Sequence, residues 1–516
     1  MVFNENDLLN SFANFSCLND NFSCLGDYYC EASTEADEPN FTLVAGTTTA
    51  EQLSTPSNNR QTKHVNQYTT ELDDTMKNLR EKVGENHPDV IWANVMIGHA
   101  SYQNDDFEEA LKYYEQAIPN AANECEKGEK EEIKFADLIF SCGLAQVGTM
   151  DKKAASFSFS RSLKIYQSVL NKYEITVDNV DVINAQNCLD EGQIRALQIK
   201  RITVLKKIGN IDFCDGDMDA ALVSYRKALD GAIDMQQKQM KTESRNTGDM
   251  MNLEGTSISM YREGLIHMAE SLSNIAAVHA RSDNLEKAIF CFNEALSIQM
   301  NALGEDDPTV AVTLDNIGTM NFRSGRFDVS LKAYKQVLKM RRKLLGADHP
   351  GVADALVHIG MTHRKKGEKD LCEYALTEGL RVKERYYGSN HMKIADFLLK
   401  LGNIYAKEDN QKDIVIAIRY FTKALSIYRI HNMNDDDYSV AHATKNIEFL
   451  KTRQEGYNGA DWYLPFDDNI CTFNSPVLSN NEFCQFFELC TGNDEQGADS
   501  MTRRDQQAKT SLAVFG

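Results

Sequence analysis

The feature that most constrains the fold is a short sequence that recurs at a fixed distance. Residues 345–350 read Leu-Gly-Ala-Asp-His-Pro and repeat, with two changes, the Leu-Gly-Glu-Asp-Asp-Pro of residues 303–308, 42 positions earlier. A repeat of 20–50 residues is typical of supersecondary units that stack side by side. We therefore predict a repeat protein, in which each unit buries its apolar face against its neighbours.

Each period predicts a helix, a tight turn and a second helix. Proline opens the first helix at Pro308 and Pro350, where its fixed backbone angle suits a helix start. Glycine at Gly325 supplies the turn. Apolar residues then recur every three or four positions, as on one face of a second helix, at Phe327, Leu331, Tyr334 and Leu338.

The same pattern can be laid over most of the chain. A small residue, which lets two helices approach closely, marks seven first helices, at Gly98, Gly143, Gly209, Ala276, Gly318, Gly360 and Gly402. The last four lie 42 residues apart, whereas the earlier intervals are 45, 66 and 67, with the excess in segments 174–192 and 240–262. We expect seven helical hairpins, longer helices and loops in those two segments, and an unpaired eighth first helix that begins near Tyr438.

These positions resemble the tetratricopeptide (TPR) consensus, and the 42-residue form resembles the repeats of kinesin light chains. The resemblance covers about 390 of the 516 residues. It implies an all-α, right-handed superhelical solenoid over residues 61–455, capped at its start by a helix over residues 65–83. A kinesin light chain also carries a long heptad region before its repeats, and one helix is too short for that.

The segments outside the solenoid have no sustained periodicity. Residues 1–60 and 456–516 are rich in Asn, Ser and Asp, so we expect an N-terminal tail and a mostly disordered C-terminal tail. Residues 461–468, Asp-Trp-Tyr-Leu-Pro-Phe-Asp-Asp, concentrate aromatic and acidic side chains. This segment is predicted either to pack on the last helix or to occupy the binding groove of its own chain.

Charge and hydropathy exclude several classes of function. The chain has 55 basic and 76 acidic residues, a net charge of −21, which disfavours general binding to nucleic acid or anionic membranes. No stretch approaches 18 uninterrupted apolar residues, and the acidic N-terminus does not resemble a signal peptide. We expect a cytoplasmic protein with no nucleic-acid or membrane partner.

Catalytic and metal motifs are absent from the sequence, which contains no phosphate-binding loop, zinc-protease motif or nucleophile elbow. In the acidic segment 212–219, Gly216 would put Ile211 and Phe213 at ligand positions of a calcium loop, so this is an interhelical turn. Histidines at equivalent positions, His87, His349 and His391, indicate a structural role between repeats. We expect no enzyme, no cofactor and no metal.

Cysteines are scattered singly through the repeats and lack the paired spacing of zinc sites. We expect those within the helices to behave as small buried hydrophobic residues, namely Cys125, Cys142, Cys188, Cys214, Cys291 and Cys372. The second helix of the central repeat carries a basic group, Lys339, Arg341, Arg342 and Lys343, which we expect to face solvent.

The candidate binding site comes from the TPR resemblance, which implies that the sixth and thirteenth residues of each first helix point into a concave groove. The sixth positions are Asn274, Asn316, His358, Lys400 and Asn446. The thirteenth positions are all basic, Arg281, Arg323, Lys365, Lys407 and Arg453. Amide and imidazole groups can bond a peptide backbone, and cations pair with carboxylates. A purely structural explanation is also open: Lys and Arg near the C-terminus of a helix interact favourably with the helix dipole, which would account for these cations without a ligand.

This pattern favours a non-catalytic adaptor or scaffold that binds short acidic or extended peptide segments of partner proteins. Two alternatives are a cargo adaptor like the kinesin light chains and a regulatory subunit of an enzyme complex. The sequence does not distinguish among these partners.

Overall fold

A computed structural model describes residues 77, 80–85, 87–176, 189–245, 255–406 and 410–455. The predicted tails, residues 1–60 and 456–516, lie outside the described residues, as do the segment 461–468, Cys188 and Lys407. So does most of the helix predicted over residues 65–83, of which the last turn, up to Val83, is described and helical. Secondary structure within the described ranges is helical throughout, as the sequence predicts.

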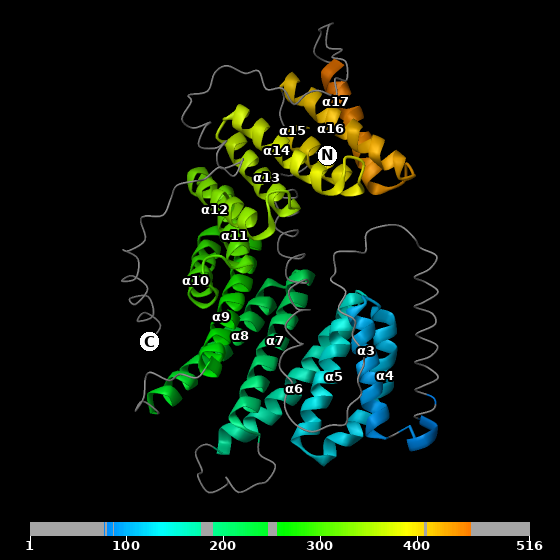
Figure 1. Cartoon of the computed structure of the whole chain (residues 1–516), viewed down its shortest axis with the longest axis vertical. Coiled ribbons are helices and arrows are strands. Elements are labelled where there is room, and N and C mark those ends of the chain that lie inside the picture. The colour runs from blue at the N-terminus through cyan, green and yellow to red at the C-terminus, as the bar shows by residue number, and fades with distance from the viewer. Residues whose placement is uncertain are drawn as a thin grey trace. The chain divides into compact units, whose positions relative to one another are not determined.

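The helices follow one another in the order expected for successive hairpins (Figure 1). Their bounds are α3 (Pro88–Gln103), α4 (Phe107–Glu124), the short 3-10 helix η1 (Cys125–Lys127), α5 (Glu129–Gly148), α6 (Lys152–Thr176), α7 (Glu191–Asp215), α8 (Met218–Arg245), α9 (Gly255–Arg281), α10 (Leu285–Leu303), α11 (Pro308–Arg323), α12 (Phe327–Leu345), α13 (Pro350–Lys365), α14 (Lys369–Tyr387), α15 (Met392–Ala406), α16 (Gln411–Ile430) and α17 (Tyr438–Glu455).

The chain divides into two compact units, residues 1–298 and 299–516, with the boundary inside α10. In unit 1 the hairpins are α3–α4, α5–α6 and α7–α8, followed by α9 and most of α10. In unit 2 they are α11–α12, α13–α14 and α15–α16, followed by the single helix α17. The helices α9 and α10 form one more hairpin, in which Cys291 of α10 packs on the cluster that contains Ile275 and Val278 of α9. Seven hairpins and a final unpaired helix are therefore found among the described residues. The prediction of an all-α stack of helical hairpins is confirmed.

Close helix packing explains the glycines that mark the first helices. A Cβ atom built on Gly318 would lie 2.6 Å from Cε1 of Tyr334, on the second helix of the same hairpin. Four other hairpins repeat this contact, in the pairs Gly98–Tyr114, Gly143–Phe159, Gly209–Tyr225 and Gly402–Phe421. An aromatic ring thus occupies the space that a side chain would need, and this brings the two helices together.

The recurring inter-repeat sequence combines a helix stop with a helix start. Gly346 ends α12 with a φ of +91°, a backbone angle that glycine adopts without strain. His349 then caps α13, because its Nδ1 accepts a hydrogen bond from the backbone N–H of Gly351 at 3.1 Å. Asp307 caps α11 in the same way through Thr309, at 2.8 Å. The histidines between repeats are structural, as predicted.

The six interhelical turns that the structure describes share one backbone geometry. Gly325 has a φ of +73°, which confirms the turn predicted there. The residue seven positions after the marker has a positive φ in five other hairpins as well, at Asp105, Met150, Gly216, Asp283 and Gly367. Gly216 ends α7 in this conformation, so the acidic segment 212–219 is an interhelical turn. The fold requires the left-handed conformation at this position, whichever residue supplies it.

The long early intervals are filled partly by longer helices. Helices α6, α7, α8 and α9 have 25, 25, 28 and 27 residues, against 15 to 20 in the regular hairpins of unit 2. Residues 177–188 and 246–254, within the predicted excess, lie outside the described residues. The expectation of longer helices in this part is confirmed.

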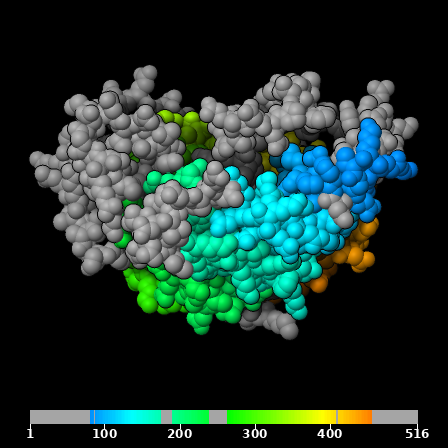
Figure 2. Space-filling view, turned by 90° about the horizontal axis from the view of Figure 1, so that it is seen from below, coloured from blue at the N-terminus to red at the C-terminus, as the bar shows by residue number. Residues whose placement is uncertain are grey.

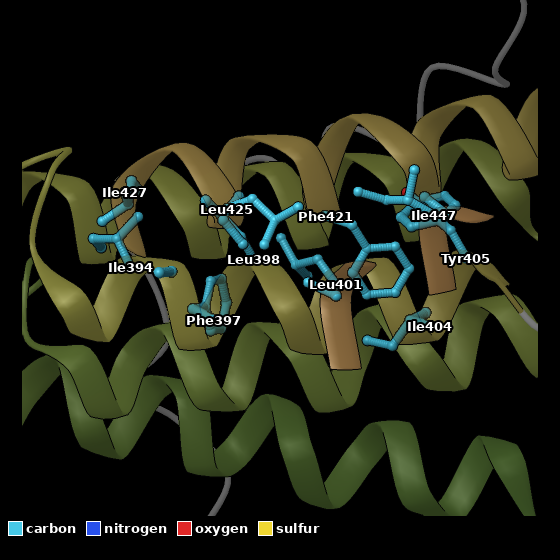
Figure 3. Packing of buried hydrophobic residues seen from close by; sticks show 14 of the residues in the cluster. Ile394, Phe397, Leu398, Leu401, Ile404, Tyr405, Phe421, Leu425, Ile427 and Ile447 are labelled. Carbon is cyan, nitrogen blue, oxygen red and sulfur yellow. The ribbon is translucent and has the colours of Figure 1, made fainter. Parts of the chain in front are cut away.

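Each unit is held together by apolar clusters between neighbouring hairpins. In unit 2, Phe397 and Leu401 of α15 face Phe421 and Leu425 of α16, and Ile447 of α17 extends the cluster (Figure 3). The space-filling view shows the helices of unit 1, coloured blue to green, side by side with their side chains in contact at the surface (Figure 2).

Two predictions about individual side chains are corrected by the structure. Cys142 and Cys372 are buried as expected, but Cys214 is exposed because it lies in the last turn of α7, next to the interhelical turn. Arg341 was expected to face solvent, yet only 14% of its side chain is exposed. Its side chain points toward α11, where it pairs with the buried carboxylate of Asp315.

Candidate peptide-binding face

The predicted binding residues of unit 2 lie on one side of its first helices, which we call the first-helix face. Residues seven positions apart complete about two helical turns, so Asn316 and Arg323 share one side of α11, and His358 and Lys365 share one side of α13. Each sixth-position residue is partly exposed, while the next residue along the helix is buried, namely Ile317, Ile359, Leu401 and Ile447. The packing between hairpins thus fixes which side of each first helix meets solvent.

A buried ionic cluster stands directly behind this face. His358 Nδ1 lies 2.9 Å from Oδ1 of Asp315, a residue of α11 whose side chain is 5% exposed. Arg341 of α12 donates from Nη2 to the other carboxylate oxygen of Asp315 at 2.9 Å, and from Nη1 to the carbonyl of Gly351 at 3.1 Å. His358 therefore connects α13 to α11, and its imidazole is oriented by Asp315.

The electrostatics of Asp315 reflect both its burial and its partners. Burial would by itself raise the pKa of the Asp315 carboxyl, but His358 and Arg341 together lower that pKa to about 2. The ring of Tyr334 lies 4.9 Å from the His358 ring and separates the cluster from the adjacent core. The carboxylate is consequently ionised at any physiological pH, and two positively charged or polar groups are fixed around it.

Lys400 has acidic neighbours on the same side of its helix. Burial lowers the pKa of Lys400, and the nearby charge of Lys383 lowers it further. The carboxylates of Asp354 and Asp396 act in the opposite direction and raise this pKa. Lys383 pairs with Asp354 at 2.9 Å. The first-helix face around α13 and α15 therefore carries both signs of charge and is not uniformly basic.

Two of the thirteenth-position arginines bond the protein's own backbone. Arg281 of α9 donates from Nη1 to the carbonyl of Phe213 at 2.8 Å and lies over the Phe213 ring at 4.8 Å. Arg453 of α17 donates to the carbonyl of Ala406 at 3.5 Å. Both carbonyls belong to the last turn of the preceding first helix, where backbone acceptors lack partners inside the helix. Arg281 therefore caps the C-terminus of α7 and Arg453 caps that of α15, through direct hydrogen bonds in addition to any interaction with the helix dipole.

The remaining predicted residues differ in exposure. Lys365 is exposed, whereas Asn274, Asn316 and Arg323 are partly exposed. Asn446 donates from Nδ2 to the carbonyl of His442, one turn earlier in α17, at 2.9 Å. Unit 1 contributes Asn274 and Arg281, and unit 2 contributes the other described residues.

The sequence analysis missed Asp315 as the anchor of His358 and Lys207 as a further sixth-position residue. Lys207 stands two residues before Gly209, the same offset as Lys400 before Gly402. Burial, followed by the neighbouring Lys206, lowers the pKa of Lys207 to about 8, although Glu270 opposes the shift. The register alone could have identified Lys207, whereas nothing local in the sequence distinguishes Asp315.

Within the ranges that the structure describes, no group of three or more His, Cys, Asp or Glu side chains is placed to hold a metal ion. None of the helices in these ranges is long and apolar enough to cross a membrane.

Comparisons with known proteins agree with the hairpin architecture. Residues 267–343 and 313–385 match a family model described as tetratricopeptide repeat, and residues 93–119 match a second model of the same description. No curated protein sequence matches the chain.

Among solved structures, aspartyl phosphate phosphatase F from Bacillus subtilis is similar over 69% of this chain and 75% of its own, at 13% identity and a TM-score of 0.42. The Rap conjugation regulator of plasmid pLS20, solved with the Phr* peptide, covers 66% of this chain and 75% of its own, at 16% identity and a TM-score of 0.36. The kinesin light chain TPR-like repeats from P. anserina cover 50% and 95%, at 10% identity and a TM-score of 0.30.

Family matches in both units coincide with helical hairpins in which an aromatic ring packs on a glycine, as between Tyr114 and Gly98 and between Tyr334 and Gly318. Residues 93–119 and 267–385 are therefore tetratricopeptide repeats, and the described part of the chain is built from helical hairpins of this kind.

Proposed function

We propose that this protein is a non-catalytic adaptor whose first-helix face in unit 2 binds a short acidic or extended peptide segment of a partner protein. The observation that carries the proposal is the repeated pairing of a polar and a basic residue, seven positions apart, on the solvent side of α11, α13 and α17. The other sides of these helices are buried in the packing between hairpins.

The chemistry of the face suits a peptide main chain. An Asn amide both donates and accepts hydrogen bonds, so Asn316 can bond a peptide backbone without reading its side chains. A lysine or arginine nearby pairs with a carboxylate, and hydrogen bonds to charged groups are the stronger kind. Lys365 offers such a cation at an exposed position.

The acidic residues on the same face limit which peptides fit. Asp354 and Asp396 lie near Lys400, so a ligand carboxylate placed there would meet repulsion as well as attraction. A peptide with carboxylates near Arg323 and Lys365 and a neutral residue near Lys400 is the best match. The proposed specificity therefore depends on carboxylate spacing, not on total negative charge.

A double charge reversal tests the proposal. Arg323→Glu with Lys365→Glu should weaken binding of a fluorescein-labelled library of short Asp- and Glu-containing peptides by at least about tenfold, since each charge-assisted hydrogen bond contributes about 1.5–3 kcal/mol. The measurement is fluorescence anisotropy at fixed ionic strength. Far-UV circular dichroism of the variant should match that of the wild type.

A matched control separates local contact from net charge. Lys332→Glu with Lys339→Glu makes the same change in net charge at two exposed positions of the second helix α12. This control should bind the library within about threefold of the wild type, because exposed charges far from the ligand are screened by salt. Equal affinities for all three proteins would reject the first-helix face as the binding site.

A further inference from the structure

A row of exposed apolar side chains crosses the second helices of unit 1. Phe157 of α6, Val223 of α8 and Phe290 of α10 are 71%, 50% and 56% exposed. All three occupy the same position in their hairpins, two residues after a fully buried alanine, which is Ala155, Ala221 or Ala288. Large exposed apolar side chains that recur in register are a surface feature, unlike apolar residues scattered singly.

The three helices are neighbours within the unit. Leu163 of α6 packs on a cluster that contains Ala228 and Met235 of α8. Cys291 of α10 packs on the cluster of Ala221 and Tyr225 of α8. The row therefore runs across adjacent second helices, which are separate from the first helices that carry the predicted peptide-binding residues.

Positive charge is concentrated at one end of this row. Between Lys152 and Tyr173, helix α6 has five basic residues and no acidic one, in a chain whose net charge is −21. Lys152 pairs with Asp215, and Lys172 pairs with Glu129 and Glu132, so the positive charge beside the row comes from Lys153, Arg161 and Lys164. Phe157 stands one turn from Lys153 on one side and from Arg161 on the other, and all three are exposed. Arg161 lies over the Phe135 ring at 5.1 Å, which fixes its position beside the row.

The charge balance changes along the row. On α8, Val223 is followed by Arg226 and Lys227, with Asp219 and Asp230 one to two turns away on either side. On α10, Phe290 has Glu286, Lys287 and Glu294 nearby. Attraction for an anion is thus strongest over α6 and falls toward α10.

We propose that this row, Phe157, Val223 and Phe290 with the exposed cations Lys153, Arg161 and Lys164, is a docking surface for an acidic amphipathic helix of a partner protein. Apolar residues of that helix cover the row, and its carboxylates lie over α6. Residues seven positions apart on a helix lie on the same side of it, so a partner helix with apolar residues at that spacing presents one apolar stripe to the row.

The test uses the full-length chain and two synthetic peptides. Each is a capped helix of about 18 residues, with leucines at seven-residue spacing. One carries Glu at the flanking positions, and the other carries Lys there. The acidic peptide should bind, and its affinity should fall as salt is added. The basic peptide should bind at least about tenfold more weakly, because like charges oppose each other over α6.

Variants then locate the binding. Phe157→Ala should weaken binding of the acidic peptide about tenfold, as truncation of a central aromatic contact does. Phe449→Ala is the matched control, since Phe449 is 59% exposed on α17 and lies outside the row. Lys153→Glu with Lys164→Glu should weaken binding by a similar factor. Phe157→Ala should weaken binding of the acidic peptide by the same factor when it is combined with Arg323→Glu and Lys365→Glu, the variant that removes proposed binding by the first-helix face.

Three results would overturn the proposal. One is no binding of the acidic peptide up to about 1 mM, a level at which even weak specific association is detected. Another is equal binding by Phe157→Ala and the wild type. The third is concentration-dependent self-association, seen by sedimentation and abolished by Phe157→Glu, which would assign the row to a second copy of the chain.

Discussion

At the scale of single residues, the inter-repeat His349 works as a neutral acceptor. His349 Nδ1 can accept the N–H of Gly351 only while that nitrogen is unprotonated. Burial lowers the pKa of His349, the nearby Asp354 opposes the shift, and Arg341 adds to it. Because this pKa lies below the unfolded value of about 6.5, the unfolded chain takes up the proton first as the pH falls. The stabilisation is therefore present above about pH 6.5 and is lost as the pH falls through the folded pKa.

Replacing His349 by the residue found at the equivalent cap should remove this pH dependence. Asp307 caps α11 with a carboxylate oxygen, an acceptor that does not depend on a neutral imidazole. His349→Asp should be close to the wild type at pH 7.5 and more stable by up to about 1 kcal/mol at pH 5.5, which is the usual contribution of one cap. Urea unfolding followed by circular dichroism at the two pH values measures the difference.

The reciprocal exchange serves as the control. Asp307→His should become less stable than the wild type as the pH falls from 7.5 to 5.5, for the same reason with the opposite sign. A difference between wild type and His349→Asp that does not change with pH would show that the imidazole does not act as a cap.

At the scale of helices, α11, α12 and α13 are tied together by the buried cluster around Asp315. Arg341 contacts this carboxylate and the first turn of α13 at once, through Asp315 and the Gly351 carbonyl. A buried charge without its partner is strongly destabilising, whereas an exposed pair contributes little. The cluster therefore couples two hairpins of unit 2 through one arginine.

Asp315→Asn should destabilise unit 2 by about 3–5 kcal/mol, since it leaves Arg341 with a neutral partner in a buried site. The matched control is Asp306→Asn, because Asp306 pairs with Lys343 at 2.6 Å but both side chains are more than half exposed. That control should cost less than about 1 kcal/mol. The free energies of unfolding of both variants are measured with denaturant. Equal decreases for Asp315→Asn and Asp306→Asn would mean that the buried cluster contributes no more than an exposed ion pair.

The same helices show which features a sequence can predict. Marker glycines, turn glycines and capping residues depend on neighbours within a few positions or within one hairpin, so the period of 42 residues identifies them. The Arg341 contact joins residues 26 positions apart in different helices. Its neighbours Lys339 and Lys343 are exposed, and nothing in the local pattern sets Arg341 apart from them.

The register of the first-helix face was predictable from the sequence, but the contacts of its side chains were not. The seven-residue offset correctly places Asn316 and Arg323 on one side of α11. It could not foresee that Arg281 and Arg453 bond carbonyls of the preceding first helix. Those contacts depend on how far one hairpin is turned relative to the next, a quantity set by core packing.

At the scale of the whole molecule, stability should be distributed along each stack, because a repeat contacts mainly its neighbours. A chain ending at Asn390 loses α15, α16 and α17, and with them most of the cluster shown in Figure 3. Hydrogen exchange read by mass spectrometry should show much faster exchange in α14 and α13 and unchanged protection in α3 to α6.

A chain ending at Glu455 keeps every described helix and is the control for truncation itself. It should exchange like the full-length protein over the described helices. Unchanged protection of α13 and α14 in the shorter chain would mean that these helices do not depend on the hairpin that follows.

The inter-repeat sequence also has a consequence for how such a chain can change in length. Its glycine stop, capping side chain and proline all act within about six residues, from Gly346 to Gly351, and they need no help from distant parts of the chain. A second copy of residues 308–349, inserted before Pro350, would bring its own stop and start signals and would leave the flanking ones intact. Tandem duplication could therefore lengthen this protein one hairpin at a time without first disrupting its fold.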